Sequence, residues 1–374
     1  MKQEDPHIAE WTAEMPLPEW AKNIPGPDLV HSWCALVAQT SAGRVENYAW
    51  YLGSSENPEA FVSVYLIRQV NLAEYISPGV ARFAQILAKM GWHPFELDIA
   101  FCELPLLHLP GFIVSPDTTP ERRLVLWRAV LQKTRQDLDV PLFAARVLPD
   151  WPEAKDSDIP YVPFISSYVL QLPSGGWKNS LPPFRRHKIS YLERRLLKRN
   201  GRAEIFTTAL PDAETLNRLY QLTVQNNADS LQHPVHVGPE LLAKLHTLPS
   251  DRRWIVGIEV EGELAAFCLA LRTGDRLLLR TGGVDPVLSR PVHGYFQVDF
   301  VVIPFAESIG CQAVDMGPTS EDIKTRLGAV AEPTAYLMDF RHWLLLPLRF
   351  LLSLRFKAES DLETSSNTIE HEQN

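Results

Sequence analysis

Three strand-like segments separated by short turns most constrain the fold of this 374-residue chain. Residues 253–260, 263–272 and 276–283 are rich in apolar and β-branched residues, as strands are. Glu261-Gly262 separates the first pair and Thr273-Gly274-Asp275 the second, and turns this short join antiparallel strands. These segments are therefore expected to form an antiparallel meander.

Helix and strand patterns alternate on both sides of the meander. Ile189, Leu192 and Leu196 follow helical spacing, and Gly201 comes soon after as a stop signal. The same reasoning predicts strand 166–172, helix 184–200, strand 203–209, a helix capped by Asp212, a short helix to Leu245, helix 294–309, strand 311–316, helix 320–327 with a capping box at Thr319 and Asp322, and strand 334–340. The expected fold class is α/β, with mixed, largely antiparallel sheets flanked by helices.

The first half of the chain carries a similar mixture of signals. Aromatic and β-branched runs predict strands over 48–52 and 61–67, and apolar spacing predicts helices over 79–90 and 120–138. Residues 139–165 are expected to add one strand and then a proline-rich crossing into the second half.

The two ends differ from the body in composition. Residues 1–28 contain five prolines and predict an extended arm, packed by Trp11 and Trp20. Residues 341–357 combine leucines with arginines and predict a C-terminal helix that packs on the first half or lies on a membrane surface. Residues 358–374 are polar and acidic, which predicts a disordered tail.

The formal net charge of −9 comes from the ends, because residues 1–28 carry −4 and residues 358–374 carry −5. This excludes a globally basic nucleic-acid binder but not a local basic patch, and no DNA binding is expected. Residues 185–202 hold eight bases and one acid. The stretch is interpreted as a solvated helix face or as a weak site for tRNA, an anionic lipid surface or the phosphates of CoA. We expect no aromatic side chains among its bases to serve as base-stacking platforms.

The cysteines and the apolar runs indicate the compartment. Cys34, Cys102, Cys268 and Cys311 form no C-x-x-C pair, which argues against a structural zinc and a disulfide framework. The N-terminal residues lack the apolar run of a signal peptide, and no stretch reaches the roughly 18 apolar residues of a membrane span. We expect a cytoplasmic protein without a metal, with a peripheral position at the inner membrane surface left open.

Three motifs in the second half carry a resemblance to a known family. They are the basic helix start Phe184-Arg185-Arg186-His187-Lys188-Ile189, the helix that opens at Gly294-Tyr295-Phe296, and Asp315-Met316-Gly317-Pro318 followed by Lys324-Thr325-Arg326-Leu327-Gly328. Their order and spacing resemble GNAT acyltransferases, and more closely the FemAB-like branch, in which two GNAT-like units occur in tandem. The resemblance assigns residues 166–340 to the acyltransferase domain, and residues 29–165 to a first GNAT-like unit by analogy.

The resemblance implies transfer of an acyl group from acyl-CoA, or a related thioester, to an amine. In such enzymes the pantetheine arm lies beside a splayed strand, here 276–283, and the pyrophosphate meets the N-terminus of the next helix, where free amides stabilise an anion. This implies donor contacts from Arg290, His293, Gly294, Thr281 and Gly282. Two departures count against ordinary acetyl-CoA use: the loop lacks a second glycine, and Pro304 interrupts the helix.

Four residues are candidates for the chemistry. Asp285 and Asp315 can take the proton of the attacking amine, although Asp285-Pro286 also reads as a turn and Asp315 as a strand-end residue. Tyr295 can protonate the leaving thiolate or simply pack. Lys324 matches the lysine of the family motif, and its alternative is a solvated helix position.

Three functions remain open at this stage. The first is an acyltransferase that acts on a small-molecule or peptidoglycan-precursor-like amine. The second is a binding or scaffold protein that kept the fold and lost the donor loop. The third is an aminoacyl-tRNA-dependent transferase, which the basic stretch favours and the lack of a long helical-hairpin insertion disfavours.

Overall fold

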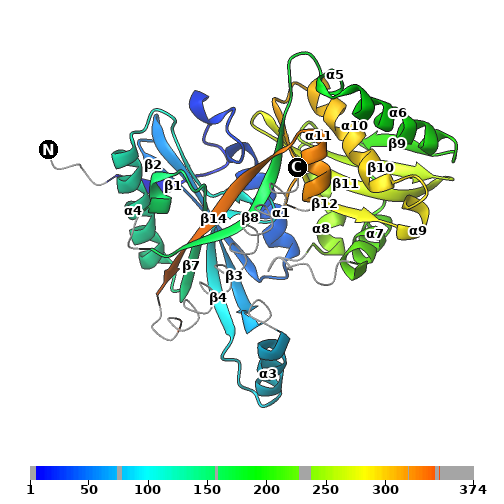
Figure 1. Ribbon diagram of the computed structural model, residues 1–374. Coiled ribbons are helices and arrows are strands. Elements are labelled where there is room, and N and C mark those ends of the chain that lie inside the picture. Colours follow the sequence, from blue (N-terminus) through cyan, green and yellow to red (C-terminus); the bar gives the residue numbers. More distant parts are fainter. Residues whose placement is uncertain are drawn as a thin grey trace, which may run out of the picture.

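Strands and helices alternate along the chain in both halves (Figure 1). The computed structural model describes residues 6–73, 78–155, 159–226, 237–318 and 320–341, together with residue 345. The first half contains β1 (Ile8–Glu10), α1 (Val30–Thr40), β2 (Val45–Gly53), β3 (Pro58–Asn71), α3 (Pro78–Lys89), β4 (Glu96–Leu104), β5 (Leu109–Pro110), β6 (Phe112–Val114), α4 (Pro120–Asp137) and β7 (Leu142–Val147). Short 3₁₀ turns cover Glu19–Ala21, Pro27–Leu29 and Pro152–Lys155.

The second half contains most of the helices that flank the sheet. Its elements are β8 (Tyr161–Gln171), α5 (Trp177–Ser180), α6 (Pro183–Leu197), β9 (Arg202–Phe206), α7 (Ala213–Asn226), α8 (Pro239–Ala243), a 3₁₀ turn at Leu245–Thr247, β10 (Arg253–Val260), β11 (Glu263–Thr273), β12 (Arg276–Val284), α9 (Pro286–Ser289), α10 (Gly294–Ser308), β13 (Ala313–Asp315), α11 (Glu321–Leu327) and β14 (Val330–Phe340).

One mixed, mostly antiparallel sheet runs through both halves. Its order is β1-β2-β3-β4-β7-β14-β8-β13-β12-β11-β10-β9, with β5 paired to β4 and β6 to β3. The last strand, β14, pairs with β7 of the first half on one side and with β8 of the second half on the other. The long strands β8 and β14 therefore join two lobes, as Figure 1 shows.

Three apolar cores lie against this sheet. One lies between α4 and the strands of the first unit, and a second lies under α5, α6, α10 and α11 in the second unit. The third includes residues of α1, α7 and α8 together with strands of both units. Because this third core draws on both halves, the two units share part of their apolar interior.

The meander is confirmed: β10 has the predicted bounds, and β11 and β12 end within one residue of theirs. The helix and strand order of the second half is also confirmed. Sequence reasoning missed α1 and β4, and it placed the start of β8 five residues late because Pro160 and Pro163 suggested a loop. The expected unit boundary at 165/166 consequently falls inside β8.

The N-terminal arm binds both units. β1 pairs with β2, and Trp11 is only 3% exposed, while the Trp20 indole donates to the carbonyl of Pro58. Asp28 forms an ion pair with Arg252 and accepts a hydrogen bond from the amide of Gly274. One of the acidic charges of residues 1–28, that of Asp28, is thus neutralised by Arg252 inside the fold.

Other expectations fall on residues that are not described. Thr319, and with it the capping box to Asp322, lies outside the described residues, as do most of 341–357 and all of 358–374. Among the helices that are described, none is long and apolar enough to cross a bilayer.

A buried ion pair fastens the two units beside the third core. Arg280 of β12 donates to both carboxylate oxygens of Asp315 in β13, at 2.6 and 3.1 Å, and each residue is at most 5% exposed. The same guanidinium donates to the carbonyl of Leu107 in the first unit at 2.8 and 2.9 Å. Ser167 of β8 completes the shell of Asp315 with a hydrogen bond of 2.6 Å.

This pair generates a stability prediction. Asp315→Asn keeps the side-chain shape but leaves the buried Arg280 charge uncompensated, so the free energy of unfolding is expected to fall by about 3–5 kcal/mol. Urea unfolding followed by circular dichroism measures the change. The double variant Arg280→Met/Asp315→Leu removes both charges and is expected to lose less than the single variant. A loss below about 1 kcal/mol for Asp315→Asn, the value of a surface pair, would contradict the prediction.

Candidate active site at the bulge of β12

The strand β12 carries an irregularity at its centre. Cys268 of β11 lies opposite Gly282, whereas the next residue, Leu269, lies opposite Arg280, so Thr281 is the extra residue of a β-bulge. Thr281 has a φ of 31°, a region that β-branched residues rarely adopt. Backbone of this kind persists where the surrounding structure holds it, and it often marks a functional site.

Beyond the bulge, α7 approaches the strand closely. A Cβ atom on Gly283 would come within 2.6 Å of backbone atoms at Leu219 and Tyr220 of α7, so only glycine fits there. On its other edge β12 pairs with β13 only from Arg276 to Leu278. Thr281 and Gly282 therefore lie past the end of the parallel pairing.

The D-x-G and lysine motif folds into one hydrogen-bonded unit. The amide of Gly317 donates to Asp315 at 2.9 Å, and the carbonyl of Gly317 accepts from Nζ of Lys324 at 2.8 Å. Lys324 is 2% exposed, and its ammonium lies 5.9 Å from the ring centre of Tyr168. The lysine is therefore a buried, oriented cation and not the solvated helix residue of the alternative interpretation.

A second buried carboxyl group, on α10, interacts electrostatically with this lysine. Asp299 is 7% exposed and makes no hydrogen bond or ion pair with any residue that the structure describes. Burial raises the pKa of Asp299 to about 7, against the opposing charge of Lys324. Burial lowers the pKa of Lys324 to about 8, with Asp299 as the main opposing influence. Both groups therefore titrate close to neutral pH, where acid–base catalysis is most effective.

Cys268 borders the same cluster. Its thiol donates to the carbonyls of Arg280 and Leu269, and burial raises its pKa to about 12, with the Asp299 charge adding to the effect. The sulfur therefore stays protonated at neutral pH. It is suited to packing behind the bulge and not to nucleophilic attack.

Basic side chains gather at the N-terminus of α10. His293 lies in the left-handed region at φ 55°, and its imidazole is 3.3 Å from the guanidinium of Arg195 in α6. Burial, then the charges of Arg195 and Lys188, lower the pKa of His293. Gly294 permits close packing on α9, since a Cβ there would lie 2.7 Å from Oγ of Ser289. Arg290 is exposed on the same loop.

The helix α6 presents aromatic as well as basic side chains. Phe184 and Tyr191 are 68% and 52% exposed, so the expectation that no aromatic residue accompanies these bases is wrong. Phe184 and Tyr191 are both visible in the sequence. What the structure adds is their exposure on the helix that also carries Lys188 and Arg195.

The remaining candidates occupy different roles. Asp285 caps α9, accepting from the amides of Val287 and Leu288, and forms an ion pair of 3.0 Å with Arg218. Although burial opposes ionisation, these partners lower its pKa, which suits a structural cap better than a base. Asp315 is also held ionised: burial opposes the charge, but Arg280 lowers its pKa to about 2.

Sequence reasoning missed Asp299. Tyr295 lies one helical turn before it, so the two side chains project from the same side of α10. The signal was present, because Asp299 is the one charged residue between Gly294 and Ala306 in a helix that is otherwise almost entirely apolar. An almost entirely apolar helix indicates a buried helix. A carboxyl group buried in such a helix is unfavourable for folding, which makes it a candidate functional residue.

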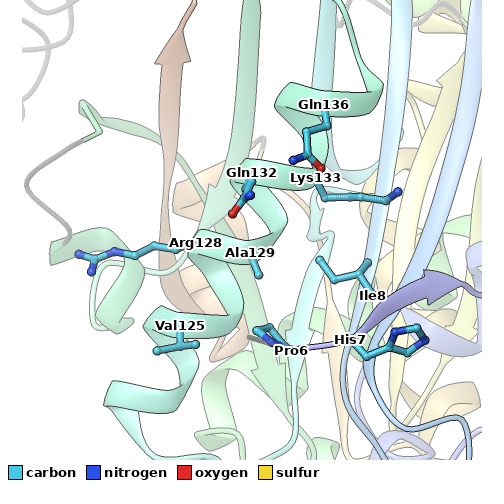
Figure 2. Close-up of a pocket in the computed structure, with 9 residues that line it drawn as sticks. All are labelled: Pro6, His7, Ile8, Val125, Arg128, Ala129, Gln132, Lys133 and Gln136. Carbon is cyan, nitrogen blue, oxygen red and sulfur yellow. The ribbon is translucent and has the colours of Figure 1, made fainter. Parts of the chain in front are cut away.

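A metal site and a surface groove are two other kinds of site that a chain of this fold can carry. No group of three or more His, Cys, Asp or Glu residues could hold a metal ion within the part of the chain that the structure describes. A groove of about 590 Å³ lies between β1 and α4, with Arg128, Gln132 and Lys133 along its helical wall (Figure 2). Its lining comes from the N-terminal arm and from α4 of the first unit, and it contains none of the residues that cluster at the bulge.

The chain is similar to known proteins in part of its sequence and in its fold. Residues 183–325 match the family model described as acetyltransferase (GNAT) domain. The fold is similar to that of FemX, with a TM-score of 0.57 and 11% identity over 87% of this chain and 96% of that one. It is also similar to the C-terminal domain (DUF2156) of a putative lysylphosphatidylglycerol synthetase from Agrobacterium fabrum, with a TM-score of 0.51 and 9% identity over 86% and 94% of the two chains.

A search of curated proteins found no significant match. The GNAT model covers the chain from α6 into α11, including the bulge and Lys324, and the FemX likeness covers 87% of the chain. Residues 183–325 therefore match the GNAT acetyltransferase domain family, and the chain as a whole has a fold similar to that of FemX.

Proposed function

We propose that this protein is an N-acyltransferase whose reaction takes place beside the bulge of β12. The observation that carries the proposal is the pair formed by Asp299 and Lys324, a buried acid and a buried base whose charges influence each other and whose pKa values are about 7 and 8. Both charges act on Cys268, which lies opposite Gly282 at the bulge, and we propose that the acyl donor binds there.

The proposed reaction assigns one task to each group. The amine nitrogen of the acceptor attacks the carbonyl carbon of the donor, and the Asp299 carboxylate takes the proton that the nitrogen loses. The ammonium of Lys324 stabilises the negative charge that develops on the carbonyl oxygen. The bond to the leaving group then breaks, and for a thioester donor Tyr295 returns a proton to the thiolate. Asp285 and Asp315 position α9 and the lysine motif.

The donor is proposed to be acyl-CoA, with Thr281 and Gly282 beside the pantetheine arm. His293, Gly294 and Arg290 lie where its pyrophosphate would bind, and Lys188 and Arg195 add positive charge there. An aminoacyl-tRNA donor is the second candidate. It is favoured by the exposed Phe184 and Tyr191 among the bases of α6, since aromatic rings next to cations suit single-stranded nucleic acid.

The acceptor is proposed to be an amine of a small molecule or a peptidoglycan-precursor-like compound. The similarity to a putative lysylphosphatidylglycerol synthetase domain makes a lipid acceptor a further possibility to include in the assay. The proposed site of action is the cytoplasm, including the inner surface of its membrane.

Donor binding is tested by thermal unfolding with CoA, acetyl-CoA, a long-chain acyl-CoA and charged tRNA in parallel. A donor at 100 times its Kd stabilises the fold by about 2.7 kcal/mol, which raises Tm by about 3–5 °C. Arg290→Ala is expected to reduce the shift caused by CoA ligands, and Arg44→Ala, at an exposed arginine of the first unit, serves as the matched control. If no donor shifts Tm, the enzyme proposal fails and a scaffold role replaces it.

The pH dependence of the reaction tests the acid–base pair. Asp299 must be ionised to accept a proton and Lys324 must be protonated to stabilise the oxyanion, so kcat/KM is expected to rise through pH 7 and to fall above pH 8. Thiol release from acetyl-CoA with a panel of amines provides the readout. Asp299→Asn is expected to abolish the acidic limb and lower the rate at least a hundredfold. An unchanged profile in that variant would remove Asp299 from the reaction.

The raised pKa of Asp299 also predicts a stability cost. The folded protein holds the proton of Asp299 up to about pH 7, whereas an unfolded aspartate releases it near 3.8, so stability is lost as the pH rises between these values. Asp299→Asn is therefore expected to be more stable than the parent protein at pH 8, by on the order of 4 kcal/mol, and nearly equal to it at pH 4. Urea unfolding at both pH values checks this, and equal stability at pH 8 would contradict it.

A further inference from the structure

The helix α3 stands apart from the rest of the fold. It connects β3 to β4 and projects from the end of these strands, away from both lobes (Figure 1). Among the residues of α3 whose burial is described, from 79 to 89, Ala84 is the least exposed, and it has a small side chain. The helix therefore gains little from packing on the body of the protein.

Large apolar side chains cover the outer face of this helix. Phe83 and Ile86 are 54% and 58% exposed, and Met90 and Trp92, just beyond the helix end at Lys89, are 76% and 64% exposed. The spacing of i, i+3 and i+7 places the first three on one stripe. These four residues, Phe83, Ile86, Met90 and Trp92, are called the apolar tip below.

The charges around the apolar tip have one sign. Residues 78–92 contain Arg82 and Lys89 and no acidic residue. At 100° per residue, Arg82 and Lys89 both lie along the same edge of the apolar stripe. When the stripe is buried, their long side chains can extend so that the charged groups stay in a polar environment. The first acids of β4 are engaged, Glu96 with His93 and Asp98 with Arg68.

We propose that the apolar tip inserts into the interface of an anionic lipid bilayer and holds the protein at the membrane surface. Exposed Phe, Trp and Ile side chains bordered by bases, without acids, match the surface of interfacial helices. Trp has an apolar ring and a polar N–H group, which suits the headgroup level. Arg82 and Lys89 supply the attraction to anionic lipids.

The size of the tip favours a bilayer over a protein partner. A 12-residue helix is about 18 Å long and about 10 Å wide, so its outer face covers on the order of 200 Å². A stable protein interface buries about 800 Å² on each partner and usually carries a rim of both charge signs. A convex, single-signed tip of this size fits a deformable lipid surface better than the complementary face of another protein.

Binding to vesicles tests the proposal and does not depend on the acyl-transfer reaction. Flotation of the full-length protein is measured with vesicles of phosphatidylcholine alone and with one quarter phosphatidylglycerol. We expect binding to the anionic vesicles. The triple variant Phe83→Ser/Ile86→Ser/Met90→Ser should weaken that binding at least a hundredfold, and Arg82→Gln/Lys89→Gln about tenfold or more, only on anionic lipid. All five positions are exposed, and circular dichroism confirms folding of each variant.

Matched controls separate this tip from other surfaces. Val330→Ser removes an equally exposed apolar side chain from β14 and should leave binding unchanged. Brominated lipids should quench the tryptophan fluorescence of the parent protein, and Trp92→Phe should remove most of that quenching. Parent-like binding by the triple variant would overturn the proposal and assign the membrane contact to α6 or to residues 341–357. Absence of binding to anionic vesicles would overturn it outright.

Discussion

The buried ion pair between Arg280 and Asp315 is the interaction on which the rest of the structure depends. β12 and β13 share only three residue pairs. Beyond these pairs, the Arg280 guanidinium joins the two strands through its hydrogen bonds to Asp315. Because it also donates to Leu107, one side chain holds two strands of the second unit and a loop of the first. Removal of either partner leaves the other as an uncompensated buried charge, so the loss of one contact destabilises the whole arrangement. Its consequences reach the site directly, since Asp315 orients Gly317, and Gly317 orients Lys324.

Two buried carboxyl groups near Lys324 have opposite pKa shifts. Burial acts against ionisation in both, but Asp315 receives hydrogen bonds from Arg280, Ser167 and Gly317, whereas Asp299 receives none from the described residues. One group is therefore a permanent anion that shapes the backbone. The other can exchange a proton near neutral pH. Titratable groups whose environments push their pKa values apart are a general mark of assigned acid and base roles.

The accuracy of the sequence interpretation follows the range of the interactions involved. The meander was predictable because its turns and its alternating apolar residues are local signals, and the same holds for the glycine that ends α11. The start of β8 was predicted five residues too late because Pro160 and Pro163 suggest a loop. In the structure, Pro163 lies within β8 and is paired with Ala335 of β14. The helix α1 was missed because its apolar residues point into a core to which both units contribute, so its pattern lacks a clear polar face.

The sequence by itself determined the order of helices and strands, the GNAT resemblance and the position of the lysine motif, because each rests on residues close together in the chain. Tertiary structure alone decided which acid can act. The three candidate acids are the same residue type in the sequence. Their pKa values differ because each has a different charged neighbour from a distant segment: Arg218 for Asp285, Lys324 for Asp299 and Arg280 for Asp315. Exposure is decided in the same way, since an apolar helix such as α3 predicts a buried face until the surrounding strands leave that face uncovered. A pKa and a solvent-exposed surface depend on neighbours in space, and the sequence lists only neighbours along the chain.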